Sequence, residues 1–412
     1  MTDLRFICTR LGGVACLALG LTACGLNESG NISAGKGGDT SHPAQRGSPT
    51  QEVRAACGDG VPTLAGAVIA RQPYLQQVTT NSAIVGWVTG APDGEHADVT
   101  LPDGTPVTSA LAEVDASALR ITGESQMWAR IEGLAPDTIY CYTVANGSPL
   151  NGRTGFRTAP AADSPEPVRF LAFGDSGGGG SDQYALLEHM FEFPYDLIVH
   201  TGDIAYDDGT IGQFEANVFG VYAELFRNLP FFPAAGNHEY NTSGAAPFRS
   251  VFALPDAHGE KWYSYDWGRI HFAALDTEAD YATQVAWLDE DLAASTAPWK
   301  IVYLHRPPYS SGDHGSDTGL RTKLGPIVEK HHVQLVLAGH DHDYERMIPQ
   351  NGVSYVVTGG GGRGTRNVGS SSFTAFAAEV IHFVYVEVGL EELVLHAVDA
   401  TGVEFDSMVV AR

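Results

Sequence analysis

The stretch Leu335-Val336-Leu337-Ala338-Gly339-His340-Asp341-His342 decides how the rest of the chain is interpreted. Its apolar half predicts a buried strand that stops at Gly339. Successive side chains of a strand point to opposite faces, so within a strand His340 and His342 could not share one metal ion. Just beyond the strand, where the chain turns, each imidazole can face a different ion. The stretch therefore predicts one half of a site for two metal ions.

Four more apolar runs end in the same way, each followed by a potential metal ligand. They span residues 168–173, 196–200, 231–235 and 299–304, and they lead to Asp175, Asp203, Asn237 and His305. Amphipathic helical segments such as 281–292 separate the runs, which is the pattern of an α/β domain. Ligands of such sheets bind beyond the carboxyl ends of the strands. We therefore expect these side chains to converge.

The chemistry of these residues fits two cations held close together. Such cations repel each other, so they need a shared anionic ligand. Asp203 is the natural bridge, because its carboxylate has one oxygen for each ion. The glycine before each ligand would let the backbone turn sharply. Carboxylates, an amide and imidazoles together suit iron, zinc or manganese better than magnesium or calcium.

Five blocks of the chain resemble the motifs of the calcineurin-like metallophosphoesterase superfamily. They are Gly174-Asp175, Gly202-Asp203-Ile204-Ala205-Tyr206, Gly236-Asn237-His238-Glu239, His305 and Gly339-His340-Asp341-His342. Tyr206 makes the resemblance specific to the purple acid phosphatase branch. The stretch His342-Asp343-Tyr344-Glu345-Arg346 is similar to a motif of the plant-type members of that branch.

The resemblance implies a binuclear metal centre with a role for each ligand. It places Fe(III) in the first site, held by Asp175, Asp203, Tyr206 and His342. It places Fe(II), Zn(II) or Mn(II) in the second site, held by the shared Asp203 and by Asn237, His305 and His340. The phenolate of Tyr206 would give the protein its purple colour. His238 and His314 match substrate-binding histidines of the family, and either could bind phosphate or protonate the leaving group.

The resemblance also implies the reaction, which is hydrolysis of phosphate monoesters by an acid phosphatase. A trivalent ion lowers the pKa of bound water further than a divalent one, so a metal-bound hydroxide is available even in acid. We expect it to attack phosphorus in line, without a phospho-enzyme intermediate. Two alternatives stay open: a phosphodiesterase or nucleotide pyrophosphatase on the same scaffold, and a catalytically inactive surface binding protein. The complete ligand set disfavours the second alternative.

The chain is expected to divide into four parts. Residues 1–24 resemble a lipoprotein signal peptide that ends at Cys24, and a plain secretory signal is the alternative. Residues 25–60 are rich in small and polar residues, which predicts a flexible linker. Residues 61–160 alternate in short strands and resemble a fibronectin type III β-sandwich. Residues 165–412 form the α/β catalytic domain, for which the resemblance implies a two-sheet α/β/β/α sandwich.

Charge and cysteine content limit the partners and the compartment. The formal net charge of −25 argues against binding to nucleic acid or to an anionic membrane surface. We expect small phosphate esters as substrates and membrane contact only through a lipid on Cys24. Without the lipid, the protein would be periplasmic or secreted. In an oxidising compartment Cys57 and Cys141 could pair, but two free thiols are equally compatible with the sequence.

Two glycine runs, at 177–180 and 359–362, suggest loops near a phosphate. Neither run is followed by the Lys-Ser/Thr pair of a P-loop, so that motif is excluded. We expect them to be flexible rims of the site. Arg363, directly after the second run, is a candidate for contact with a substrate phosphate.

Overall fold

The computed structural model describes residues 49–61, 69–120, 123–255 and 258–412. The expected signal peptide, Cys24 and most of the expected linker lie outside the described residues. Within the described ranges, no helix is both long and apolar enough to cross a membrane.

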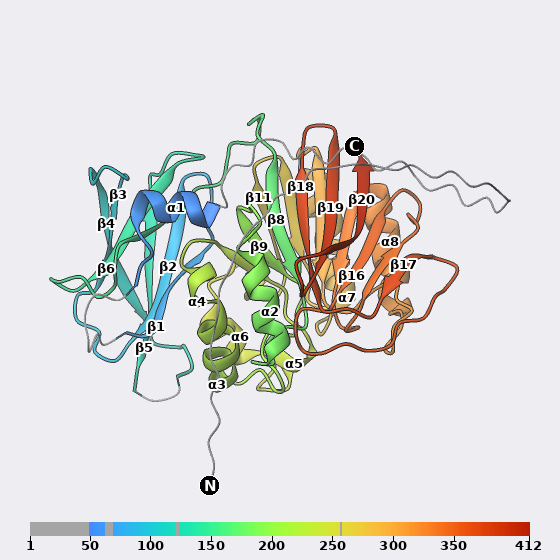
Figure 1. Ribbon diagram of the computed structural model, residues 1–412, viewed down its shortest axis with the longest axis horizontal. Coiled ribbons are helices and arrows are strands. Elements are labelled where there is room, and N and C mark those ends of the chain that lie inside the picture. Colours follow the sequence, from blue (N-terminus) through green and yellow to red (C-terminus); the bar gives the residue numbers. More distant parts are fainter. Residues whose placement is uncertain (1–48, 62–68, 121–122, 256–257) are drawn as a thin grey trace, which may run out of the picture. The chain divides into compact units, whose positions relative to one another are not determined.

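The described residues up to 157 contain one helix followed by seven strands (Figure 1). The elements are α1 (Pro49–Cys57), β1 (Ile69–Gln76), β2 (Ser82–Thr89), β3 (His96–Thr100), β4 (Pro106–Asp115), β5 (Ser125–Glu132), β6 (Ile139–Ala145) and β7 (Thr154–Arg157). The strands pair antiparallel in the order β1-β2-β5-β4-β3-β6-β7. Trp87 is fully buried in their core. The more specific assignment to the fibronectin type III fold stays a prediction.

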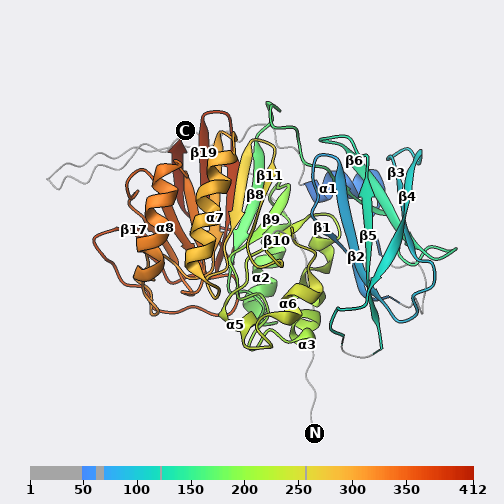
Figure 2. The ribbon, with the colours of Figure 1, turned by 180° about the vertical axis from the view of Figure 1, so that it is seen from behind.

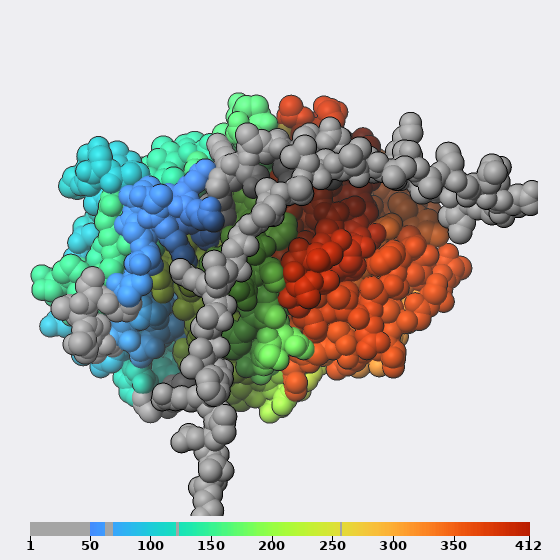
Figure 3. All heavy atoms as spheres, in the orientation of Figure 1, coloured from blue at the N-terminus to red at the C-terminus, as the bar shows by residue number. Residues whose placement is uncertain are grey.

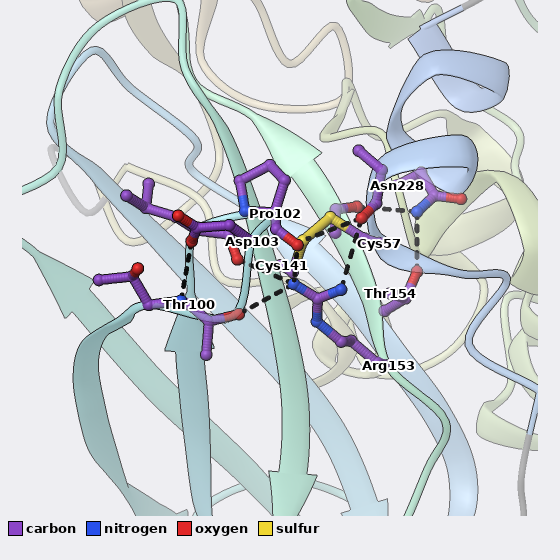
Figure 4. The surroundings of a disulfide bond; sticks show 12 residues. Cys57, Thr100, Pro102, Asp103, Cys141, Arg153, Thr154 and Asn228 are labelled. Atoms are coloured by element: carbon purple, nitrogen blue, oxygen red, sulfur yellow. Dashed lines mark hydrogen bonds between the residues drawn. A yellow bond between two sulfur atoms is a disulfide. The ribbon is translucent and has the colours of Figure 1, made fainter.

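Helix α1 corrects the expectation that residues 25–60 form a flexible linker, which is wrong for residues 49–57. Cys57 at its end forms a disulfide with Cys141 of β6, with 5.3 Å between the Cα atoms (Figure 4). Val53 is buried, and Arg157 of β7 forms an ion pair with Glu52 at 2.6 Å. Local composition missed this helix because contacts with strands far along the chain hold it in place.

Two mixed sheets form the rest of the described chain. The first has the order β10 (Phe231–Pro233), β9 (Leu197–His200), β8 (Val168–Phe173), β18 (His382–Val388), β19 (Glu392–Asp399) and β20 (Glu404–Ala411). The second has the order β11 (Tyr263–Trp267), β12 (Ile270–Ala274), β13 (Trp299–Leu304), β14 (Leu335–Ala338), β16 (Ser354–Thr358), β15 (Tyr344–Met347) and β17 (Thr374–Ala378). The sheets pack face to face, and Phe170 of the first meets Phe272 of the second at 5.3 Å between ring centroids. In Figure 3 the C-terminal part, in orange and red, forms a broad area of the visible surface.

Helices accompany both sheets. The helices that follow β8, β9 and β10 along the chain are α2 (Ser181–Met190), α3 (Ile211–Gln213), the π-helix η1 (Phe214–Phe219), α4 (Gly220–Phe226), α5 (Asn237–Tyr240) and α6 (Ala246–Val251). The second sheet is covered by α7 (Tyr281–Ala294) and α8 (Thr318–Lys330), which lie side by side in Figure 2. Leu288 of α7 and Leu324 of α8 pack with Val302 and Val336 of that sheet in one apolar cluster. The order of layers is therefore α/β/β/α.

The strands β1–β7 and the two-sheet part contact each other through several buried hydrogen bonds. The Tyr74 hydroxyl donates to the carbonyl oxygen of Val251 at 2.6 Å, and the Tyr142 hydroxyl donates to that of Arg227 at 2.9 Å. All described residues belong to one compact unit.

Parallel pairing decides where the site lies. Strands β8, β9 and β10 are parallel neighbours in the first sheet, and β13 and β14 are parallel neighbours in the second. The carboxyl ends of parallel strands lie at the same edge of a sheet, and the loops that follow them meet there.

Candidate metal centre

Every predicted metal ligand except Tyr206 lies within four residues after the carboxyl end of one of these strands. Asp175 follows β8, Asp203 follows β9, Asn237 begins α5 after β10, His305 follows β13 and His340 follows β14. Three of these residues have left-handed backbone, with φ of 58° at Asp175, 53° at Asp203 and 74° at His340. Residues with a Cβ rarely adopt this conformation, and they concentrate at functional sites. The sharp turn thus lies at the ligands themselves.

The glycines before the ligands allow close approach of the loops. A Cβ at Gly236 would lie 2.2 Å from Oδ1 of Asp203, and a Cβ at Gly339 would lie 2.5 Å from Oδ2 of Asp175. Neither distance is possible for real atoms, so any larger residue would push the ligand loops apart.

One group of side chains converges on the hydroxyl of Tyr206. This oxygen lies 2.9 Å from Oδ1 of Asp175, 3.1 Å from Oδ2 of Asp203 and 3.1 Å from Nε2 of His342. All four side chains are buried. They are the four residues predicted for the first metal site, and the fold brings them together.

A second group converges on Nε2 of His305. This nitrogen lies 3.1 Å from Oδ1 of Asn237, 3.2 Å from Nδ1 of His340 and 3.2 Å from Oδ2 of Asp203. The ligand atoms of Asp203, His305 and His340 all lie within 4.8 Å of one another. The residues predicted for the second metal site are therefore also brought together.

Asp203 joins the two groups through a single oxygen. Its Oδ2 faces both Tyr206 and His305, whereas its Oδ1 accepts a hydrogen bond of 2.9 Å from the backbone N–H of His238. This differs from the expectation that each carboxylate oxygen would face a different ion. The difference arises because the backbone of the neighbouring loop occupies Oδ1.

The electrostatics of the two groups fit a bound cation. Burial opposes charge on His305, but the Asp203 carboxylate raises the pKa of His305 to about 10. Burial and the charge on His305 lower the pKa of His340 to about 2, so His340 keeps a free lone pair. Burial and the carboxylates of Asp175 and Asp203 raise the pKa of Tyr206 well above its ordinary value. A phenolate at Tyr206 therefore requires strong positive charge beside it, which a metal ion would provide.

Glu239 holds the ligand loops in register, a role that sequence reasoning did not assign. Its fully buried carboxylate accepts hydrogen bonds of 2.8 to 3.0 Å from four backbone N–H groups. The donors are Asp203, Ile204, Ala205 and Gly236. Burial and the Asp203 carboxylate raise the pKa of Glu239, whereas the four donors favour its charged form. The loops after β9 and β10 are thus tied to one side chain.

The two predicted substrate-binding histidines lie beside different groups. The His238 ring lies 4.3 Å from the Tyr206 ring between centroids, and its Nε2 lies 3.7 Å from Oδ2 of Asp203. The His314 ring stacks on the His340 ring at 4.2 Å between centroids. The backbone N–H of His314 donates to Asp341 at 2.7 Å, which fixes a loop whose position the sequence left uncertain.

The second glycine run is not a flexible rim, so that expectation is wrong for residues 359–362. These glycines are buried, and the N–H of Gly361 donates to the carbonyl oxygen of Gly174 at 2.9 Å. A run of glycines predicts mobility from composition alone, but here the lack of side chains lets the loop pack against the ligand-bearing loop after β8. Sequence reasoning also missed Arg366, which contacts His314. Its only signal was a second arginine shortly after Arg363.

Comparison with known proteins defines the class. Residues 168–344 match the family described as calcineurin-like phosphoesterase, and they form a calcineurin-like metallophosphoesterase domain. The chain is similar to purple acid phosphatase 23 of Arabidopsis thaliana, with 28% identity over 280 residues, which cover 56% of this chain and 61% of the plant protein. It is similar to the nucleotide pyrophosphatase/phosphodiesterase of Hordeum vulgare, with 27% identity over 267 residues, 50% of this chain and 72% of that protein.

A solved structure shows the same fold. The purple acid phosphatase PPD1 from yellow lupin (Lupinus luteus) seeds superposes with a TM-score of 0.75 at 22% identity, covering 82% of this chain and 74% of that chain. This superposition confirms the prediction of a two-sheet sandwich, and the family match of residues 168–344 confirms the prediction of a calcineurin-like metallophosphoesterase domain. Together with the donor set, the family implies a binuclear metal centre. The matched part of the chain spans 61% of the length of the Arabidopsis relative.

Proposed function

We propose that the protein hydrolyses phosphate monoesters as a binuclear metal-dependent acid phosphatase. One observation carries the proposal: two buried groups of donors, on Tyr206 and on His305, share Oδ2 of Asp203. The first group would hold Fe(III), because its two carboxylates and a phenolate offset the charge of a trivalent ion. The second group would hold Fe(II), Zn(II) or Mn(II) through Asn237, His305, His340 and the shared carboxylate.

When bound, the metal pair would supply an activated water as nucleophile and positive charge for the phosphoryl oxygens. The side chains of the protein would orient the ester. His238 lines a cavity beside Tyr206, and from there it would contact a phosphoryl oxygen. His314 stacks on His340 of the second ligand group, and there it would bind phosphate or donate a proton to the leaving oxygen.

A phosphodiesterase or nucleotide pyrophosphatase is the second candidate function. The name of the Hordeum vulgare relative favours it, since that protein is similar over 50% of this chain. A catalytically inactive binding protein is the third candidate. The two complete ligand groups disfavour it, because buried ionisable side chains with strongly shifted pKa values are concentrated at functional sites.

The disulfide supports export from the cytoplasm. Disulfides persist in oxidising compartments and are rare in reducing ones, so the Cys57–Cys141 bond fits a periplasmic, secreted or surface location. We propose that the chain is exported and anchored by a lipid on Cys24, which lies outside the described residues.

The test compares a monoester with a diester. Purified protein is loaded with iron and zinc, and turnover of para-nitrophenyl phosphate is measured beside that of its bis ester. We expect monoester turnover to exceed diester turnover and to disappear in Asp203→Asn, which removes the shared oxygen's charge. Turnover of the diester alone would favour the second candidate, and no metal and no turnover would favour the third.

A further inference from the structure

The π-helix η1 contacts both strand β1 and a loop of the candidate metal centre, although none of its residues is a predicted ligand. π-Helices are rare, and they occur frequently at functional sites. Glu215 and Phe219 are four residues apart in η1, so they lie on one face of the helix. Asn217 is two residues from both and therefore lies on another face. The two faces have different partners.

Arg71 of β1 holds the first face of η1. Its side chain is buried, and its Nε donates to both carboxylate oxygens of Glu215, at 3.0 and 3.2 Å. The guanidinium also lies over the Phe219 ring, 4.1 Å from the centroid. Its Nη1 donates to Oε1 of Gln126 on β5 at 2.8 Å. Because the guanidinium is planar and contacts two side chains of η1, it fixes the orientation of this helix against the sheet of β1–β7.

Asn217, on the other face, holds the backbone of Tyr206. Its Nδ2 donates to the carbonyl oxygen of Tyr206 at 3.3 Å and to that of Gly177 at 3.0 Å. The backbone N–H of Tyr206 donates to the same oxygen of Gly177 at 3.0 Å. The N–H and the carbonyl group of this ligand residue are therefore both held in contacts that include Asn217 or its partner.

The loops after β8 and β9 are packed tightly at this point. A Cβ at Gly177 would overlap the carbonyl oxygen of Ile204, so only glycine allows the two loops to come this close. Gln183 of α2 adds two hydrogen bonds of 2.8 Å, since its Nε2 donates to the carbonyl oxygen of Asn217 and its Oε1 accepts from the N–H of Gly179. A displacement of η1 would therefore be transmitted to both loops.

We propose that Arg71, Glu215 and Asn217 are positioning residues for the candidate metal ligand Tyr206. This proposal rests on the proposed function. It gives strands β1–β7 a role in the reaction: Arg71 fixes η1, and Asn217 fixes the Tyr206 peptide, so that the hydroxyl points into the first ligand group. Residues that orient a ligand raise the affinity for the ion, because less ordering is needed when the ion binds.

The proposal treats the two ions differently. Tyr206 belongs only to the first ligand group, so a loosened Tyr206 peptide should weaken binding of the first ion. The second ion would keep Asn237, His305 and His340. A general loss of stability, by contrast, would weaken the binding of both ions.

The test measures the affinity for each ion in protein loaded with iron in the first site and zinc in the second. Asn217→Ala removes the donor to Tyr206, and Arg71→Gln removes the guanidinium from the other face of η1. Tyr142→Phe is the matched control, because it removes a different buried hydrogen bond between strands β1–β7 and the two-sheet part, the one to Arg227. Competition with a chelator, followed by mass spectrometry, gives both affinities.

We expect iron to bind about tenfold more weakly in Asn217→Ala and to bind more weakly, by a smaller factor, in Arg71→Gln. The affinity for zinc should stay constant in both variants, and neither affinity should change in Tyr142→Phe. The visible absorption band of the iron-loaded protein should shift in Asn217→Ala and stay in place in Tyr142→Phe, since the band depends on the geometry of the Tyr206 phenolate.

The double variant Arg71→Gln/Asn217→Ala shows whether the two residues act through each other. If Arg71 acts on Tyr206 only through Asn217, the two losses do not add, and the double variant should bind iron as Asn217→Ala does. Losses that add would overturn the proposal. Equal weakening of iron and zinc, or the same loss in Tyr142→Phe, would also overturn it.

Hydrogen exchange separates this proposal from the proposed function, because it requires neither metal nor turnover. In metal-free protein, peptides that cover 174–180 and 201–209 should exchange faster in Asn217→Ala and Arg71→Gln than in wild type and Tyr142→Phe. Unchanged exchange in Asn217→Ala would contradict the positioning role even in an active phosphatase. Faster exchange in a protein that binds no metal would support the positioning of Tyr206 and contradict only the proposed function. If Arg71→Gln does not fold, Asn217→Ala still decides, because Asn217 is only half-buried.

Discussion

At the scale of single residues, Tyr206 connects ligand chemistry with packing. Its hydroxyl lies within 3.1 Å of donor atoms of Asp175, Asp203 and His342, and its ring contacts His238 and Arg363. The hydroxyl therefore contacts the side chains of the first ligand group, whereas the ring forms part of the wall of the neighbouring cavity. The two roles can be separated by removing the oxygen alone.

The variant Tyr206→Phe tests the role of the oxygen. We expect iron-loaded wild type to show a visible absorption band and Tyr206→Phe to show none, because phenylalanine has no phenolate. The far-ultraviolet circular dichroism should not change, since the ring still packs. A colourless iron-loaded wild type would contradict the assignment of Fe(III) to this group and would favour a centre of zinc or manganese alone.

Glu239 contacts the backbone of the loops that carry Asp203 and Asn237. In Glu239→Ala, four backbone N–H groups lose their acceptor, and each buried unsatisfied group costs about 1 kcal/mol or more. We expect the free energy of unfolding in urea to fall by about 4 kcal/mol or more, and metal affinity to fall by about tenfold or more. The matched control is Glu290→Ala, at an exposed glutamate of α7. Equal stability and metal affinity in the two variants would refute this positioning role.

At the scale of elements, a buried histidine connects β11, β12 and α7. His271 of β12 lies 2.7 Å from Oδ1 of Asp266 on β11 and 2.8 Å from Oδ2 of Asp291 on α7. Burial opposes its charge, but hydrogen bonds to the two carboxylates raise the pKa of His271 from 6.5 to about 9. The helix is thus joined to the second sheet by a protonated imidazole.

This pairing predicts a pH dependence of stability. A raised pKa of a histidine stabilises the fold fully below the unfolded pKa, and the stabilisation is lost as the pH rises through the folded pKa. Wild type should therefore lose about 2 kcal/mol of unfolding free energy between pH 6.5 and about 9, a value reduced for the exposure of Asp266. In His271→Gln, urea unfolding at constant metal content should show no such loss of unfolding free energy over this pH range. Parallel pH profiles for both proteins would disprove the linkage.

The sequence predicted several strands and one helix of the two-sheet part closely, but it did not predict helix α1 or the buried packing of the glycine run 359–362. The strands expected at 168–173 and 299–304 are β8 and β13 without a shift, and the helix expected at 281–292 is α7 with a longer end. Their signals are local, because apolar periodicity needs no knowledge of distant residues. Helix α1 and the buried run 359–362 depend on partners far along the chain. Local composition could not show those partners.

At the scale of the whole molecule, the disulfide closes a long loop, since Cys57 and Cys141 are separated by 84 positions. Such a cross-link restricts the unfolded chain, and for loops of this length the loss on removal is about 4 kcal/mol. We expect urea unfolding of the double variant Cys57→Ala/Cys141→Ala to give a free energy of unfolding that is lower by that amount, with a midpoint at lower urea concentration. Turnover per folded molecule should stay equal to wild type, because the bond lies outside the candidate centre. Unchanged stability would show that α1 is held by its other contacts.

The candidate centre was more predictable in its members than in its geometry. Residue type and position after strand ends predicted all the candidate ligands except Tyr206, because the fold requires those ends to meet. Tyr206 was predicted only from the resemblance to the purple acid phosphatases. Only Oδ2 of Asp203 faces both ligand groups, because Oδ1 accepts a hydrogen bond from the backbone of His238. The position of Arg366 depends on a hydrogen bond between its backbone N–H and the carbonyl oxygen of His342. Both depend on contacts between segments, which a linear pattern does not contain.

The central claim is that two ligand groups share Asp203, and metal content measures it most directly. Mass spectrometry of iron- and zinc-loaded protein should find about two ions per chain in wild type, as a binuclear site requires. His340→Ala should lose chiefly the ion of the second group, and His342→Ala chiefly that of the first. Asp203→Ala should lose both. One ion or none in wild type, or loss of the same ion in both histidine variants, would contradict the account.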